Sequence, residues 1–174
     1  MPDGRGAGRL TLVLGGARSG KSVHGERLVT NGPPPWTYIA TAQALDAEMT
    51  ERIAAHRARR DARWRTVDAP LDLAEALAAA PDDGPVLVDC LTLWLSNTML
   101  AGRDVEAAGA RLADMLSRPR GPWVVVSNEV GLGIVPDTPL GRRFRDAQGR
   151  LNQAVAAAAD AVVLMVAGLP MKVK

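Results

Sequence analysis

The chain has 174 residues, and 47% of them are hydrophobic, which is enough to build one sizeable core. The formal net charge is only +2 and aromatic residues make up 3%, so the composition gives no grounds for a surface that binds a long nucleic acid. The single cysteine, Cys90, excludes an internal disulfide and fits a reducing compartment. No apolar run approaches the roughly 20 residues of a membrane span, and the residues before the first strand lack a signal-peptide pattern. We expect one cytoplasmic domain over residues 1–174, with residues 1–8 disordered.

The first predicted strand, residues 10–14, runs into the motif Gly15-Gly16-Ala17-Arg18-Ser19-Gly20-Lys21-Ser22, which a helical pattern follows. This is the strand, loop and helix context of a phosphate loop (P-loop). Gly15 and Gly20 allow backbone torsions that turn successive N–H groups towards an anion. Lys21 offers a point charge to the outer phosphates, and Ser22 offers a hydroxyl to Mg²⁺. The motif predicts a site for Mg²⁺ and a nucleoside triphosphate, with a plain glycine turn as the alternative.

Hydrophobic periodicity and glycine or proline breakers divide the chain into alternating strands and helices. The expected strands cover residues 10–14, 36–40, 64–67, 86–90, 123–127 and 161–166, and a short antiparallel edge strand covers 171–174. The expected helices cover residues 22–29, 46–60, 71–80, 91–100, 105–116 and 139–159. Alternation of this kind indicates an α/β fold in which a mostly parallel sheet has helices on both faces.

Three carboxylates lie at or just after the carboxyl ends of predicted strands, where open α/β sheets place their ligands. Asp89 stands where P-loop proteins hold Mg²⁺ directly or through water, and capping of the next helix is its alternative role. Asp68 would meet a ribose hydroxyl or cap the helix that follows it. Glu129 would contact metal or substrate, and a place in a surface turn is the alternative.

The two histidines differ in their surroundings. Helical spacing places Arg52 and Arg60 one turn to either side of His56, with Arg59 three residues on. Cations at these positions would lower the pKa of His56, favour its neutral nucleophilic form and supply donors to a bound phosphate. The alternatives are a histidine at the edge of a core stripe and a run of arginines that is simply solvated. His24, on the helix after the phosphate loop, is expected to pack or cap, with a catalytic role as the alternative.

The combined motifs resemble the bifunctional adenosylcobinamide kinase/adenosylcobinamide-phosphate guanylyltransferase family of cobalamin biosynthesis. The resemblance covers nearly the whole chain, and the His56 helix and the loop 128–136 are its most specific parts. The segments that carry it are 15–22, 38–42, 46–56, 64–66, 89–92, 128–136 and 149–153.

The resemblance implies a RecA-like sheet, a homotrimer and two successive reactions. First, ATP or GTP phosphorylates the aminopropanol hydroxyl of adenosylcobinamide. Then GTP guanylylates His56 with release of pyrophosphate, and the GMP passes to adenosylcobinamide phosphate. The implied nucleotide contacts are the P-loop residues Gly15 to Ser22 together with Ala40, Thr41, Ala42, Arg57, Ala58, Arg59, Arg60, Asp68 and Asp89.

Two other functions stay open at this point. One is a P-loop kinase with a single activity, in which His56 is only structural. The other is a RecA-like ATPase that depends on nucleic acid, which the low aromatic content disfavours. The expected partners are ATP, GTP, adenosylcobinamide and its phosphate, without a nucleic acid.

Overall fold

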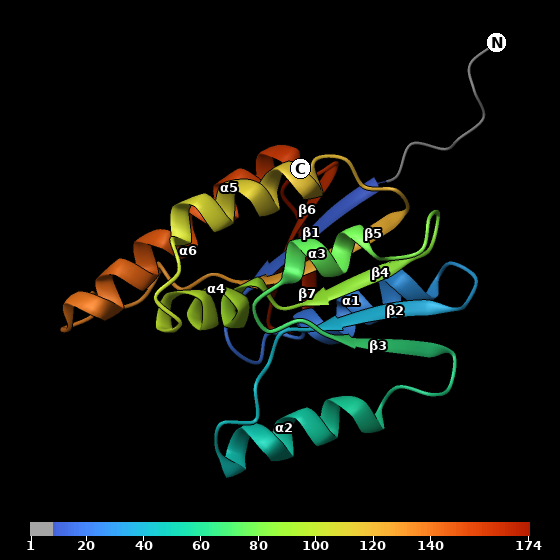
Figure 1. The fold of residues 1–174 in the computed structure, drawn as a ribbon, viewed down its shortest axis with the longest axis horizontal. Helices are drawn as coiled ribbons and strands as arrows, with labels where there is room; N and C mark the ends of the chain where they lie inside the picture. The colour runs from blue at the N-terminus through green and yellow to red at the C-terminus, as the bar shows by residue number, and fades with distance from the viewer. Residues whose placement is uncertain (1–8) are drawn as a thin grey trace.

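The structure, a computed structural model, describes residues 9–174, so the expected disorder of residues 1–8 lies outside it. Seven strands form one sheet in the order β3-β2-β4-β5-β1-β6-β7 (Figure 1). The first six strands run parallel, and β7 pairs antiparallel with β6. The strands are β1 (Arg9–Gly15), β2 (Trp36–Ala40), β3 (Trp64–Asp68), β4 (Val86–Asp89), β5 (Pro122–Asn128), β6 (Ala161–Val166) and β7 (Leu169–Lys172).

Helices cover both faces of this sheet, as predicted. They are α1 (Lys21–Thr30), α2 (Ala47–Ala58), α3 (Leu73–Ala78), α4 (Leu91–Leu100), α5 (Val105–Leu116) and α6 (Pro139–Ala158). One core cluster joins the sheet to α3, α4, α5 and α6, and a second joins its other face to α1. Successive strand residues divide between the two clusters, Leu12 belonging to the first and Val13 to the second. None of the helices within residues 9–174 is both long and apolar enough to cross a bilayer.

The central strands are buried on both faces, so their near-continuous apolar runs suit a parallel sheet. Helix α1 lies very close to this surface at Gly25. A Cβ atom at Gly25 would lie 3.0 Å from Leu87 Cδ1 and 3.2 Å from Val126 Cγ2. Glycine therefore lets the helix that follows the phosphate loop pack directly on β4 and β5.

Helix α2 is an exception. Figure 1 shows it below the edge strand β3, apart from the other helices. The Asp46 carboxylate caps α2 by accepting from the Met49 N–H at 2.7 Å. None of the twelve residues of α2 is buried, although the structure describes all of them. Met49, Ile53 and His56 recur at helical spacing but are only half-buried, so the alternative that placed His56 at the edge of a core stripe does not describe this helix.

Some predicted boundaries also need correction. The helix predicted over residues 46–60 ends at Ala58. Arg60 therefore lies beyond the carboxyl end of the helix, and its side chain reaches back to the last turn. The edge strand spans Leu169–Lys172 instead of 171–174. Ala167 and Gly168 both have positive φ values, 51° and 81°, which form a two-residue hairpin that pairs Val166 directly with Leu169.

Candidate active site

The phosphate loop connects the carboxyl end of β1 with the amino end of α1. Gly20 precedes the helix in the left-handed region, at φ 93°. Lys21 is buried, and its Nζ donates to the Gly16 carbonyl oxygen at 2.6 Å. Burial lowers the pKa of the Lys21 ammonium, and the neighbouring acidic groups of Cys90 and Asp89 oppose this shift.

Two further features of the loop fit an anionic ligand. A Cβ atom at Gly15 would lie only 2.5 Å from Ser19 Oγ and 3.0 Å from the Met165 carbonyl oxygen, so the tight turn needs glycine there. Ser19 Oγ is buried and finds no hydrogen-bond partner within residues 9–174. A buried hydroxyl without a partner is costly, and a phosphate oxygen would satisfy it.

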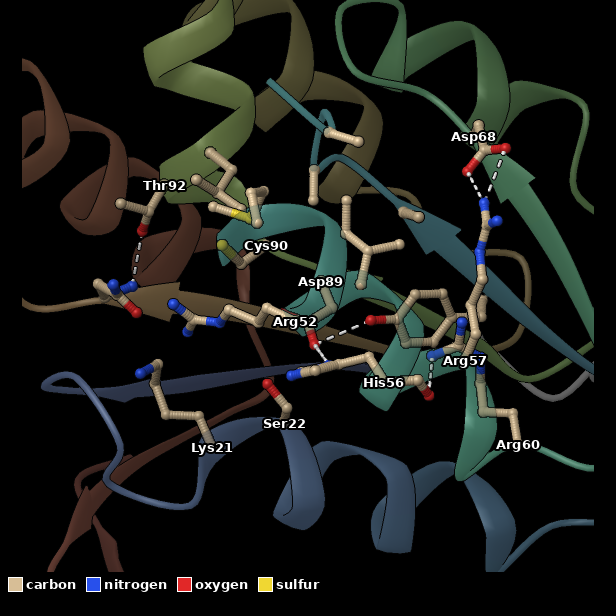
Figure 2. Close-up of a pocket in the computed structure, with 18 residues that line it drawn as sticks. Lys21, Ser22, Arg52, His56, Arg57, Arg60, Asp68, Asp89, Cys90 and Thr92 are labelled. Atoms are coloured by element: carbon tan, nitrogen blue, oxygen red, sulfur yellow. Dashed lines mark hydrogen bonds and ion pairs between the residues drawn. The ribbon is translucent and has the colours of Figure 1, made fainter. Parts of the chain in front are cut away.

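A cavity of about 350 Å³ opens beside the loop, at the carboxyl ends of β2, β3 and β4. Strand register explains why these residues meet, since Ala40 pairs with Asp68 on one side and with Asp89 on the other. Figure 2 shows side chains from α1, α2 and these strands pointing into this space. The predicted site residues in its lining are Lys21, Ser22, Ala40, Ala42, His56, Arg57, Arg60, Asp68 and Asp89.

A second hollow, of about 560 Å³, lies between the phosphate loop and α2. Arg18, Ser19, Gly20 and Arg59, all predicted nucleotide contacts, line it. Four residues line both spaces, namely Lys21, Ser22, Arg52 and His56. The imidazole therefore stands at the boundary between the phosphate-loop hollow and the cavity at the carboxyl ends of β2, β3 and β4.

His56 comes from the last turn of α2 and faces β4 and the phosphate loop. Its Nδ1 lies 3.8 Å from Asp89 Oδ2 and 3.4 Å from Arg59 Nη2. Figure 2 shows the other ring nitrogen on the side of Ser22 and Lys21. The side chain of His56 is 24% exposed and that of Asp89 is 10% exposed, so water screens their interaction only partly.

The pKa of His56 is lowered, in the direction that the arginines suggested. Burial is the main cause, however. Asp89 and Glu26 raise the pKa, while Arg59 and Arg52 lower it further. The neutral imidazole is therefore favoured chiefly by desolvation, and the flanking cations contribute less than the sequence argument assumed.

Asp89 has a different environment from that of a helix cap. The N-cap residue of α4 is Cys90, and the Asp89 carboxylate faces the cavity instead. The Tyr38 hydroxyl donates to Asp89 Oδ2 at 3.0 Å. Asp68 also caps no helix, because Asp72 precedes α3. Its carboxylate accepts from Arg57 Nη2 at 3.3 Å.

Tyr38 was not among the predicted site residues. Its ring lies beneath the guanidinium group of Arg60, with Arg60 Cζ 3.6 Å from the ring centroid. Arg60 Nη1 in turn donates to the His56 carbonyl oxygen at 2.9 Å. Tyr38 stands inside a motif that the sequence analysis singled out, but a strand tyrosine is as well explained by packing. Only the pairing of β2 with β4 shows that its hydroxyl reaches a carboxylate.

Some predicted residues lie away from the cavity or are occupied elsewhere. Thr41 is fully buried, and its hydroxyl donates to the Cys90 carbonyl oxygen at 2.7 Å and accepts from the Cys90 N–H at 2.8 Å. Thr41 thus holds the carboxyl end of β4 in place. Within the described chain, Ala58 and His24 do not line the cavity. The nucleotide contacts of Thr41 and Ala58 stay predictions.

Glu129 follows β5 next to the phosphate loop. Its N–H donates to the Gly15 carbonyl oxygen at 3.1 Å, while its carboxylate accepts from the Gly131 N–H at 2.7 Å in its own loop. It does not line the cavity among the residues that the structure describes. Its role in substrate binding stays a prediction.

The oxygen donors near the phosphate loop fit Mg²⁺, which prefers hydroxyl, carboxylate, phosphate and water oxygens. Ser22 and Asp89 line the same cavity. Residues 9–174 contain no group of three or more His, Cys, Asp or Glu side chains that could hold a metal ion. A magnesium ion at this place would therefore share its coordination with the phosphates of a nucleotide.

Comparison with solved structures supports the fold. The RadB recombinase superposes with a TM-score of 0.51 over 91% of this chain and 74% of its own, at 15% identity. The VirB11 ATPase of the Brucella suis type IV secretion system gives a TM-score of 0.50 over 95% of this chain and 47% of its own, at 12% identity. The expected RecA-like P-loop fold is confirmed. At such low identity, these likenesses concern the fold alone.

Sequence comparison identifies the family. The chain is 50% identical over 166 residues to the bifunctional adenosylcobalamin biosynthesis protein CobP of Pseudomonas aeruginosa, covering 94% of this chain and 96% of that protein. It is 43% identical over 182 residues to the bifunctional adenosylcobalamin biosynthesis protein CobU of Salmonella typhimurium, covering 95% and 99%. Residues 11–173 match the family described as cobinamide kinase / cobinamide phosphate guanyltransferase. The chain therefore belongs to this family, which confirms the resemblance noted in its sequence.

Proposed function

We propose that this chain catalyses two successive reactions on adenosylcobinamide. In the first, ATP or GTP phosphorylates the aminopropanol hydroxyl. In the second, GMP passes from GTP through His56 to adenosylcobinamide phosphate, which yields adenosylcobinamide-GDP. The observation that carries the proposal is the position of His56, which lines both the phosphate-loop hollow and the neighbouring cavity at the carboxyl ends of β2, β3 and β4.

The first reaction needs little covalent chemistry from the protein. Phosphoryl transfer depends on positioning and on neutralising the charge that the phosphate oxygens share. Lys21, the loop N–H groups and the amino end of α1 supply these interactions. Ser22 and Asp89 would hold Mg²⁺, which would supply positive charge to neutralise that of the phosphates.

The second reaction needs a nucleophile. The lone pair of the neutral imidazole attacks the α-phosphorus of GTP, a P–N bond forms, and the P–O bond to the β-phosphate breaks. Pyrophosphate leaves with that electron pair. A phosphate oxygen of adenosylcobinamide phosphate then attacks the same phosphorus, and the P–N bond returns its electron pair to the imidazole. The lowered pKa of His56 keeps the attacking form neutral near pH 7.

The remaining expectations belong to the same proposal. We take residues 1–174 as a single catalytic domain that acts in the cytoplasm as a homotrimer, with no nucleic acid as partner. The family match over residues 11–173 supports the cobinamide-related substrates. Arg57, Arg59, Arg60 and Asp68 line the two spaces and offer polar contacts to the ribose and phosphates of the nucleotide.

The test uses GTP labelled at the α-phosphate, with the purified full chain and Mg²⁺. The expected product is a protein adduct that is labile in acid and stable in base, as a phosphoramidate should be. His56→Ala should abolish the label. His24→Ala, which changes the chain's other histidine on α1, is the matched control and should keep it.

Formation of the label by His56→Ala would contradict the assignment of the nucleophile. If the unaltered chain forms no adduct but transfers the terminal phosphate to cobinamide, only the kinase half of the proposal survives. Hydrolysis of ATP that needs DNA and ignores cobinamide would favour the nucleic-acid-dependent ATPase instead.

A further inference from the structure

The hydroxyl of Tyr38 and the imidazole of His56 approach the same carboxylate oxygen. Tyr38 donates to Asp89 Oδ2 at 3.0 Å, and His56 Nδ1 lies 3.8 Å from that oxygen. Figure 2 shows the Asp89 carboxylate beside the imidazole of His56, joined to it by a dashed line. The three side chains come from β2, β4 and α2, which are far apart in the sequence.

The tyrosine itself has little freedom to move. It is 4% exposed, and its ring meets Trp64 edge to face with the ring centroids 6.1 Å apart. Burial and the nearby Asp89 raise the pKa of Tyr38, so the group remains a phenol and a hydrogen-bond donor. A buried donor aimed at one carboxylate oxygen orients that carboxylate.

A second contact links Tyr38 to the backbone of His56. The guanidinium group of Arg60 stacks on the tyrosine ring, with Arg60 Cζ 3.6 Å from the centroid. The same guanidinium donates through Nη1 to the His56 carbonyl oxygen at 2.9 Å. Tyr38 is therefore linked to His56 in two ways. Its hydroxyl connects to the His56 imidazole through Asp89, and its ring connects to the His56 backbone through Arg60.

We propose that Tyr38 is a positioning residue for the nucleophile, holding Asp89 against His56 Nδ1 so that the other ring nitrogen faces the phosphate loop. This inference rests on the proposed guanylyl transfer. Asp89 then serves both reactions, as a group near Mg²⁺ in the first and as the partner of the imidazole in the second. Hydrogen bonds that orient the ligands of a metal site are typically worth about 10- to 100-fold in affinity or activity, and we expect a loss of the same order for a hydrogen bond that orients a nucleophile.

The test is Tyr38→Phe, which removes the hydroxyl and keeps the ring beneath Arg60. The single-turnover rate of His56 guanylylation should fall about 10-fold or more, while the Kd for GTP changes by less than about threefold. The rate of phosphoryl transfer to cobinamide should fall by a clearly smaller factor. In an Asp89→Asn background, adding Tyr38→Phe should cost less than about twofold, because the two groups act through one contact.

Trp36→Phe is the matched control. Trp36 lies on the same strand, is 3% exposed, also packs on Trp64 and donates its indole N–H to the Gly32 carbonyl oxygen at 2.9 Å. Trp36→Phe therefore removes a hydrogen bond and side-chain volume from the same strand without touching Asp89. Guanylylation by Trp36→Phe should stay within about twofold of the parent rate.

Three results would overturn the assignment of Tyr38. The first is a fall of less than about fivefold in the guanylylation rate of Tyr38→Phe. The second is an equal fall in its rate of phosphoryl transfer to cobinamide, and the third is a fall in the guanylylation rate that is just as large when Tyr38→Phe is added to Asp89→Asn. Failure of the unaltered chain to form any adduct is a different result, since it removes the proposed function itself. An adduct in the parent chain with no effect of Tyr38→Phe removes only the role of Tyr38.

Discussion

The phosphate loop and helix α2 form opposite walls of the same site, yet different forces hold them. The loop grows from β1, where Leu10, Leu12 and Val13 are completely buried between two helical layers. Helix α2, described along its whole length, buries no residue. The proposed phosphate cradle is therefore fixed by core packing, whereas the proposed nucleophile, His56, lies on a helix that hydrophobic burial does not fix.

Polar contacts at the carboxyl end of α2 hold this helix against the rest of the molecule. Arg59 pairs with Glu26 of α1 at 3.1 Å, Arg57 pairs with Asp68 of β3 at 3.3 Å, and Arg60 stacks on Tyr38. Exposed ion pairs each contribute at most about 1 kcal/mol, and salt screens them. The position of His56 therefore depends on several weak contacts acting together.

The largest effect is expected at the rigid wall. Lys21→Ala removes the buried cation of the loop, so both reactions should slow by about 100- to 1,000-fold, the usual cost of losing one charge-stabilising group. Separate assays of cobinamide phosphorylation and His56 guanylylation measure the two losses. Lys172→Ala, at an exposed position in β7, should leave both rates unchanged. If Lys21→Ala slows only one reaction, the two nucleotides do not share the cradle.

A change in the core behind the loop should act on stability. Leu12→Ala leaves a cavity in the largest core cluster and should lower the free energy of unfolding by about 3 kcal/mol. Urea denaturation followed by circular dichroism measures this change. The control is Leu132→Ala, whose side chain is 86% exposed, with an expected effect below about 0.5 kcal/mol. Similar effects of both variants would contradict the assignment of β1 to the core.

Removing a helix cap tests whether α2 is held less firmly than a helix of the core. Asp46 caps α2 and Asp104 caps α5, and each carboxylate accepts from backbone N–H groups of the first turn. Replacing either by Ala should cost about 1 kcal/mol of local helix stability. Because α5 belongs to the core, Asp104→Ala should lower the free energy of global unfolding by that amount.

Asp46→Ala should hardly change global unfolding, since α2 buries no side chain within the described structure. It should instead speed hydrogen exchange of the α2 amides, as expected for a helix that opens locally. Hydrogen–deuterium exchange with mass spectrometry, alongside urea denaturation, separates the two cases. An equal loss of global stability in both variants would show that α2 unfolds together with the core.

The smallest effect concerns the pH dependence of His56. Its pKa is lowered from 6.5, so the neutral form dominates above the lowered pKa, and guanylylation should fall only as the pH drops through it. Glu26 raises this pKa and Arg59 lowers it. Glu26→Gln should therefore move the acidic limb of the rate profile to lower pH, and Arg59→Gln should move it to higher pH. Single-turnover rates across the pH range test both signs. A shift of the acidic limb in the same direction in both variants would contradict the prediction.

Much of the fold could be predicted from local patterns. A parallel sheet covered on both faces needs continuous apolar strands, and Val86–Val88 and Trp123–Val126 have this character. The phosphate loop was equally clear, because each position of the motif has its own chemical role. A core stripe on α2 was the alternative setting for His56, and the structure leaves that face half-buried, because periodicity shows that a face is apolar but not that another layer covers it.

The sequence by itself determined the phosphate loop, the alternation of strands and helices, and the choice of His56 as the candidate nucleophile. Only the tertiary structure decided what surrounds that nucleophile. Pairing of β2 with β4 brings Tyr38 to Asp89, and the contacts of α2 bring His56 to the same carboxylate. Local patterns follow from the few neighbouring residues that share a strand or a turn. The meeting of Tyr38, His56 and Asp89 depends on strand order and register, which the whole chain settles as it packs.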